Sequence, residues 1–227
     1  MKLLGLPLRR AAARFRDDVR GPRGLVLLVS LGFVVISPFV LRQFLQSVVL
    51  QIIIFSLAVT SWNLIAGYYG MFSFTHAALF GVGAYTTVIA TSEFGVPAVA
   101  ALALGGLAAG VLSLPITLPS LRLGGSYVAM ITLAYAEIIH LAAITFRDIT
   151  GGPTGYTGFE PMFGGDRVAY FYFVLAVVAL LVCLQYLLLV SRYGLIARAI
   201  RESEDAAQML GNNTYRHKLG GFFVGSA

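Results

Sequence analysis

Two ionisable side chains, Glu137 and His140, interrupt an otherwise apolar stretch of this 227-residue sequence. Their spacing of three residues places both on one face of a helix. Ionisable groups in such surroundings are energetically costly, so they usually mark a function or a specific partner. A di-metal carboxylate bundle would need Glu-x-x-His on two helices and two further carboxylates. Glu137 is the only acidic residue in the long apolar stretches, which excludes that metal centre.

Three roles remain open for Glu137 and His140. Glu137 can pair with a histidine or a hydroxyl group and organise the core, or both side chains can line a substrate pathway. The third role is a proton relay from Glu137 to His140 or to His76. The residue types alone do not choose among these roles.

A second polar cluster, Ser73, Thr75 and His76, lies in the glycine-containing segment 70–85. Hydroxyl groups and glycines interrupt a smooth helix there, and irregular backbone at membrane depth persists only beside protein or a water-filled cavity. A free helix N-terminus in such a break can hold a carboxylate. We therefore predict that these three side chains line a pathway. A histidine that bonds to a backbone carbonyl is the alternative.

No arrangement typical of an enzyme accompanies these residues. The glycine-rich loop 150–158 lacks the Gly-Lys-Ser/Thr ending of a phosphate loop, so we predict a tight turn on the outer side. The single cysteine, Cys183, excludes a disulfide framework and a cysteine metal site. We predict a protein that is not an enzyme, with no catalytic residue, no bound metal and no cofactor.

Composition identifies the elements that must position these side chains. Hydrophobic residues make up 58% of the chain and charged residues 11%, with a mean hydropathy of +0.84. A soluble domain carries about 25% charged residues, so much of this surface must face lipid. The net charge of +6 does not indicate nucleic-acid binding, because the basic residues flank apolar stretches and form no single basic face.

Six apolar stretches are long enough to cross a bilayer as helices, which takes roughly 20 residues each. They are 25–41, 44–66, 71–90, 96–119, 126–146 and 169–190, and a seventh starts near Leu219. No small-x-small cleavage site follows the first, so we interpret it as a retained anchor. The sequence predicts an all-α integral membrane protein: a polytopic bundle of six full spans plus the start of a seventh.

Small residues are dense in two of these stretches. Gly81 and Gly83 lie in the third, and Gly106 and Gly110 form a GxxxG pair in the fourth. Such residues let helix backbones approach closely inside a bilayer. We therefore expect tight packing around these two spans.

Lysine and arginine residues are distributed unequally across the predicted spans. With a cytoplasmic N-terminus, the inner segments 1–24, 67–70, 120–125 and 191–218 hold 13 of these 16 residues. The outer segments hold 3. Positive residues accumulate on the cytoplasmic side of membrane proteins. We therefore predict a basic cytoplasmic segment at 1–24 and a membrane domain over 25–227.

The cytoplasmic segment 191–218 is predicted to form a short amphipathic helix or a pair of helices that ends at Gly211. At helical spacing, one side of this segment carries apolar residues: Ile196, Ile200, Ala206, Ala207 and Leu210. Another side carries charged residues: Arg198, Arg201, Glu202 and Asp205. A mixed-charge helix with an apolar stripe suits docking into a groove of a protein partner. A solvated helix without a partner is the alternative.

The octapeptide 204–211, Glu-Asp-Ala-Ala-Gln-Met-Leu-Gly, resembles the EAA loop of ABC importer permeases. The longer segment 194–227 is similar to branched-chain amino acid permeases. Three further blocks, 70–85, 121–139 and 150–155, resemble that family in the same order. One departure follows Gly211, where the family usually has an apolar residue and then asparagine, whereas this chain has Asn212-Asn213.

The resemblance assigns an ATPase-coupling role to one set of residues: Arg198, Arg201, Glu202, Glu204, Asp205, Ala206, Ala207 and Gly211. It implies a permease subunit of an ATP-binding-cassette importer in the bacterial inner membrane, moving branched-chain amino acids by alternating access. The implied partners are a homologous second permease subunit, two cytoplasmic ATP-binding subunits and a periplasmic substrate-binding protein. Family members continue for two or three more spans, so we expect this chain to lack the last ones.

Other functions remain compatible with the residues. A urea or short-amide permease of the same architecture is the nearest. An ion- or proton-coupled carrier that uses Glu137 and His140 belongs to a different class. A membrane scaffold without a transport role is the third.

Overall fold

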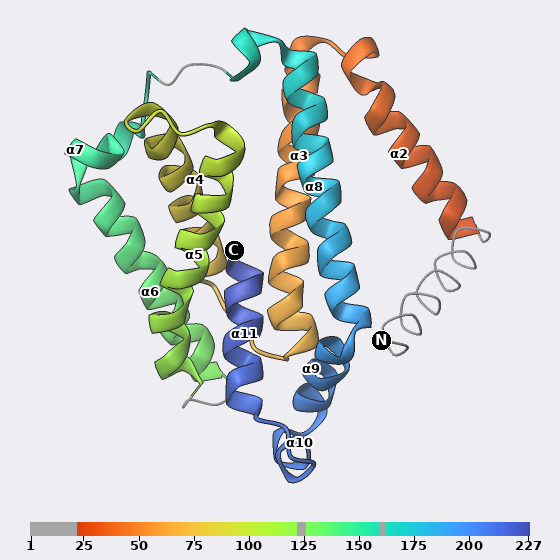
Figure 1. Cartoon of the computed structure of the whole chain (residues 1–227), viewed down its shortest axis with the longest axis vertical. Coiled ribbons are helices and arrows are strands. Elements are labelled where there is room, and N and C mark those ends of the chain that lie inside the picture. The colour runs from red at the N-terminus through yellow and green to blue at the C-terminus, as the bar shows by residue number, and fades with distance from the viewer. Residues whose placement is uncertain (1–21, 122–125, 159–161) are drawn as a thin grey trace. The chain divides into compact units, whose positions relative to one another are not determined.

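The computed structural model describes residues 22–121, 126–158 and 162–227. These residues form helices and turns, with no strand among them, which confirms the predicted all-α class (Figure 1). The elements in chain order are α2 (Pro22–Val40), α3 (Gln43–Asn63), the π-helix η1 (Leu64–Tyr68), α4 (His76–Ser92), α5 (Ala98–Ser120), α6 (Ser126–Thr145), α7 (Arg147–Thr150), the 3-10 helices η2 (Gly152–Thr154) and η3 (Met162–Gly165), α8 (Arg167–Val190), α9 (Arg192–Glu202), α10 (Glu204–Met209) and α11 (Thr214–Ser226).

Four of the described helical segments are long and apolar enough to cross a membrane: Gln43–Tyr68, Ala98–Ser120, Tyr127–Thr145 and Arg167–Val190. In α2 the corresponding apolar segment is shorter, Val29–Val40. The count of six spans and the cytoplasmic N-terminus therefore stay predictions. Of the basic segment 1–24, residues 1–21 lie outside the described residues, as does Arg122.

Two predicted boundaries differ from those in the structure. The third stretch was expected to be helical from residue 71, but residues 69–75 are not helical and α4 begins at His76. The last stretch was expected from Leu219, whereas α11 begins at Thr214. That earlier start has a local cause, because the Asn213 side chain accepts a hydrogen bond from the backbone N–H of Arg216 and caps the helix.

Contacts divide the described chain into two units. The first unit contains α2, α8 and the part of α3 up to Leu57, and α3 and α8 pack through apolar side chains. Its core is formed by Ile53, Phe171, Val174 and Val178. The Tyr172 hydroxyl also donates a hydrogen bond to the Val35 carbonyl of α2 at 2.8 Å.

The second unit, Ala58–Gly165 with Ile196–Ala227, contains α4, α5, α6 and α11. Here α4 and α5 approach so closely that a Cβ atom at Gly105 would lie 2.5 Å from the Gly83 carbonyl oxygen. At Gly106 and Gly110 a Cβ atom would instead lie 2.6 Å from the Ala227 carbonyl oxygen and 2.9 Å from the Phe223 ring. Thus α5 packs against α4 with one small face and against α11 with another.

Candidate functional site

The non-helical segment 69–75 is held by buried hydroxyl groups. Ser73 and Thr75 are 1% and 0% exposed, and their hydroxyl oxygens lie 2.8 Å apart. The Trp62 indole N–H donates to the Ser73 carbonyl at 2.8 Å. The predicted interruption of the helix is therefore present, and polar groups of the protein satisfy this part of it.

A contact from α6 completes this segment. The backbone N–H of Phe74 donates to the Thr132 hydroxyl at 3.1 Å, and Thr132 is 0% exposed. Thr132 also bonds to its own helix, to the Val128 carbonyl at 2.8 Å. One buried threonine thus joins the break before α4 to the middle of α6.

His76 is the first residue of α4, and its side chain differs from those of Ser73 and Thr75 because its polar atoms have no hydrogen-bond partner among the described residues. Both ring nitrogens are buried, and neither has a hydrogen-bond partner among the described residues. The His76 ring centroid lies 6.1 Å from that of Phe222 in α11. The backbone-carbonyl partner considered for this histidine is not seen. A neutral imidazole in this state keeps one donor and one acceptor for a ligand or water.

Glu137 and His140 do not join this buried cluster. Both side chains are exposed on α6, whereas the buried residues Val128 and Thr132 lie on its other face. Glu137 has no hydrogen-bond or ion-pair partner in the described part of the chain. The sequence correctly predicts that the two share a face, but the structure does not show a histidine or hydroxyl that pairs with Glu137.

Segment 191–218 contains the helix pair α9 and α10, which is one of the two forms predicted for it. Ser203 separates α9 from α10, and its hydroxyl accepts from the Ala206 backbone N–H at 3.3 Å. Gly211 has a φ of +83°, a left-handed conformation that favours glycine after a helix. In the predicted apolar stripe, Ala207 is buried, but Leu210 is 79% exposed. Leu210 directly follows α10, which ends at Met209, so it lies outside the helical part of this stripe.

Two arginines of α9 hold the end of the π-helix η1. Arg201 donates from its guanidinium to the Gly67 carbonyl at 2.5 Å, and the Arg198 guanidinium lies 5.1 Å from the centre of the Tyr68 ring. These four residues, with Asn63 and Glu202, line a pocket of about 400 Å³. Arg198 and Arg201, to which the family resemblance assigns a coupling role, thus contact the segment that leads into the break before α4.

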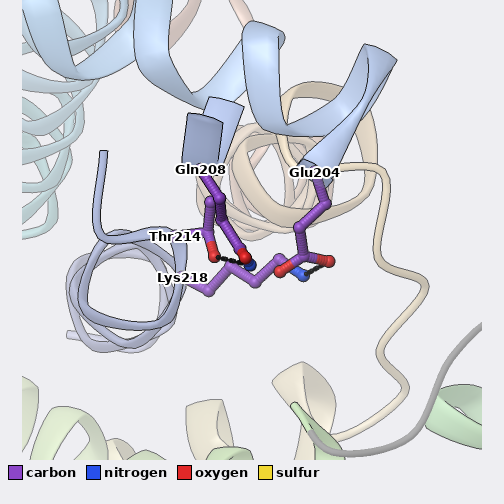
Figure 2. A network of polar contacts seen from close by, with 4 residues as sticks. All are labelled: Glu204, Gln208, Thr214 and Lys218. Carbon is purple, nitrogen blue, oxygen red and sulfur yellow. Dashed lines mark hydrogen bonds and ion pairs between the residues drawn. The ribbon is translucent and has the colours of Figure 1, made fainter. Parts of the chain in front are cut away.

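Glu204 of α10 contacts α11. Its carboxylate forms an ion pair of 2.5 Å with the Lys218 ammonium, and Gln208 donates to the Thr214 hydroxyl at 2.9 Å (Figure 2). Asp205 and Ala206 are exposed. Sequence reasoning missed Lys218, which it placed among the charges that flank the membrane. No local spacing indicates this pair, because 14 residues separate its members.

The glycine-rich loop 150–158 forms the predicted tight turns. Gly151, Gly155 and Gly158 have φ values of +76°, +72° and +89°. The Tyr156 hydroxyl donates to the Glu93 carboxylate at 2.9 Å, which ties the loop to the end of α4. The loop therefore has a defined shape at the far end of α4 from His76.

Known proteins share sequence with most of this chain. Residues 44–227 match the family described as branched-chain amino acid transport system / permease component. The high-affinity branched-chain amino acid transport system permease proteins LivM of Salmonella typhimurium (strain LT2) and Escherichia coli (strain K12) are each 26% identical over 235 residues, covering 89% of this chain and 54% of the relative. The chain thus spans about half the length of these relatives, and no solved structure gives a significant match. Because the family match covers most of the chain, the protein belongs to the branched-chain amino acid transport system permease family.

Proposed function

We propose that this chain forms the membrane-embedded part of a permease subunit of an ATP-binding-cassette importer. The observation that carries the proposal is the helix pair α9–α10, which ends in the left-handed Gly211 within a family of transport permeases. Met209 and Leu210 at its tip are 88% and 79% exposed, although both are large and apolar. Adjacent exposed apolar side chains of this kind suit a groove on a partner protein.

The family suggests the partners. Two cytoplasmic ATP-binding subunits would receive the α9–α10 tip, including the exposed Asp205 and Ala206. A homologous second permease subunit would complete the bundle in the bacterial inner membrane, and a periplasmic binding protein would deliver substrate. Closure of the ATP-binding subunits would then move α9 and α10 and open the pathway alternately to the two sides.

The substrates we propose are branched-chain amino acids, and the pathway includes Ser73, Thr75 and His76. His76 has unpaired ring nitrogens, so it can bond to a polar group of a passing solute. Ser73 and Thr75 would hold the backbone of the break in place beside it. Glu137 and His140 would face either the pathway or another protein subunit, because a carboxylate exposed to lipid is unfavourable.

The test is uptake of labelled leucine into membrane vesicles that contain the complete transporter. We expect uptake to stop when ATP is removed and to persist when the proton gradient is collapsed. The opposite result would favour the second candidate, a proton-coupled carrier. Glu137 supports this candidate, because its side chain is exposed and has no ion-pair or hydrogen-bond partner among the described residues. Excess unlabelled valine should compete with leucine, whereas competition by urea alone would indicate a short-amide permease.

A further inference from the structure

We propose that the Glu204–Lys218 ion pair transmits the movement of α10 to α11, so that Glu204 acts in coupling through its own chain. This inference rests on the proposed function. It assigns Lys218, which the family resemblance left without a role, as a positioning residue for transport. It also separates Glu204 from Asp205 and Ala206, which are exposed and available to an ATP-binding subunit.

Two parallel contacts join the helices (Figure 2). Glu204 and Gln208 lie four residues apart on α10, and Thr214 and Lys218 lie four residues apart on α11, so each pair shares one helix face. The first contact is the 2.5 Å ion pair of Glu204 and Lys218, and the second is the 2.9 Å hydrogen bond from Gln208 to Thr214. A sideways displacement of α10 would therefore pull on α11 at two positions, Thr214 and Lys218.

The turn between the helices is also held at several points. The Asn212 backbone N–H and side-chain amide both donate to the Ala207 carbonyl, at 3.2 and 3.3 Å. Asn213 caps the first turn of α11. The departure from the family at Asn212 thus supplies a side-chain hydrogen bond across the turn, and α10, the turn and α11 form one connected piece.

The two members of the ion pair differ in exposure. The Lys218 side chain is 11% exposed and that of Glu204 is 43% exposed. Loss of Glu204 would leave a buried ammonium without a partner, whereas loss of Lys218 would leave a carboxylate that water still reaches. The pair therefore predicts an asymmetry in stability: neutralising Glu204 should lower Tm more than neutralising Lys218.

The middle of α11 contacts the candidate pathway. A Cβ atom at Gly221 would collide with the Tyr69 ring, and Phe222 is 1% exposed and lies beside His76. The Ser61 hydroxyl donates to the Gly225 carbonyl at 2.5 Å. Movement received at Lys218 would thus reach the break before α4 through a helix that packs tightly along its length.

The experiment compares Glu204→Gln, Lys218→Met and the exchange Glu204→Lys/Lys218→Glu in the complete transporter. Arg216→Met is the matched control, since Arg216 is an exposed cation on the same turn of α11. The readout is the amount of leucine taken up per ATP hydrolysed. We expect each single change to lower this ratio by about tenfold, within the usual range for coupling between sites, and the exchange to recover most of it. Arg216→Met should leave the ratio unchanged.

Thermal unfolding of the purified chain is the second measurement, followed by the fluorescence of the single tryptophan, Trp62. Glu204→Gln should lower Tm more than Lys218→Met, and the exchange should recover both losses. If Lys218→Met transports like the wild type while Glu204→Gln does not, Glu204 acts on another subunit and the inference is overturned. An exchange as defective as the single variants overturns it too. A wild-type transporter without ATP-driven uptake overturns the proposed function itself, and the inference with it.

Discussion

In the first unit α3 and α8 meet through large apolar side chains around Phe171, whereas in the second unit α4, α5 and α11 approach one another at glycines. Lipid tails are as apolar as these side chains, so helices in a bilayer associate mainly through close packing and hydrogen bonds. Large side chains can repack when a neighbouring residue changes. Two helix backbones in direct contact cannot adjust in this way. The unit that holds the proposed pathway is therefore the one that tolerates the least change in helix separation.

The most damaging change should be Gly105→Val in α5. Its Cβ would lie 2.5 Å from the Gly83 carbonyl oxygen, which belongs to the backbone and cannot rotate away. We expect a loss of about 3 kcal/mol or more in the free energy of unfolding, the upper part of the range for overpacking. Unfolding of the purified chain in mixed micelles, followed by Trp62 fluorescence, measures this. Gly81→Val is the control, because no atom lies within 4 Å of its Cβ position. Equal effects of the two variants would contradict the close backbone contact between α4 and α5 that distinguishes the second unit.

A smaller loss should follow Phe171→Ala in the first unit, where the side chain is 1% exposed. In lipid the transfer part of the loss is small, and the cavity part amounts to about 2 kcal/mol for a ring-sized void. A spin label on the single Cys183 of α8 reports on this unit, and its mobility should increase while Trp62 fluorescence changes little. Leu180→Ala, at an exposed position of the same helix, should leave the label unaffected. A change confined to Trp62 would contradict the assignment of Phe171 to the first unit.

The smallest effect should come from Tyr172→Phe. It removes the hydrogen bond to the Val35 carbonyl and leaves the ring in place. Hydrogen bonds between membrane helices contribute about 0.6 kcal/mol on average, so unfolding should shift by about that amount. Tyr186→Phe, on an exposed part of α8, provides the baseline. A loss as large as that of Phe171→Ala would mean that hydrogen bonding, and not side-chain packing, holds the first unit together.

Much of the fold could be predicted from the sequence, because long apolar segments in lipid have few alternatives to a helix. The predicted ends of α5 and α8 lie within two residues of the observed ones. The interruption before His76 and the helix pair that ends at Gly211 were predicted from glycine and hydroxyl-bearing residues. The start of α11 could have been found, since Asn213 is a strong capping residue. It was interpreted only as the end of the preceding helix.

The site was less predictable. The spacing of Glu137 and His140 correctly placed them on one face, but spacing cannot say whether that face is buried. Lys218 has the residue type and position of a membrane-flanking charge, and only the packing of α11 buries it against Glu204. The π-helix η1 has no simple pattern in its residues, and its contact with Arg201 joins positions 134 residues apart. Contacts between distant parts of the chain were therefore what the sequence did not reveal.

The adjacent glycines of α5 have a consequence for how this helix can turn about its own axis. Gly105 faces α4 and Gly106 faces α11, so rotation in either direction drives one of the two backbones into a neighbour. A helix with a single small face can relieve an added methyl group by rolling away from it, but α5 has no direction in which to roll. During evolution, enlargement of either glycine would first require α4 or α11 to move outward. Variation in α5 should therefore accumulate on its third, exposed side, at positions such as Leu104, Leu107 and Val111.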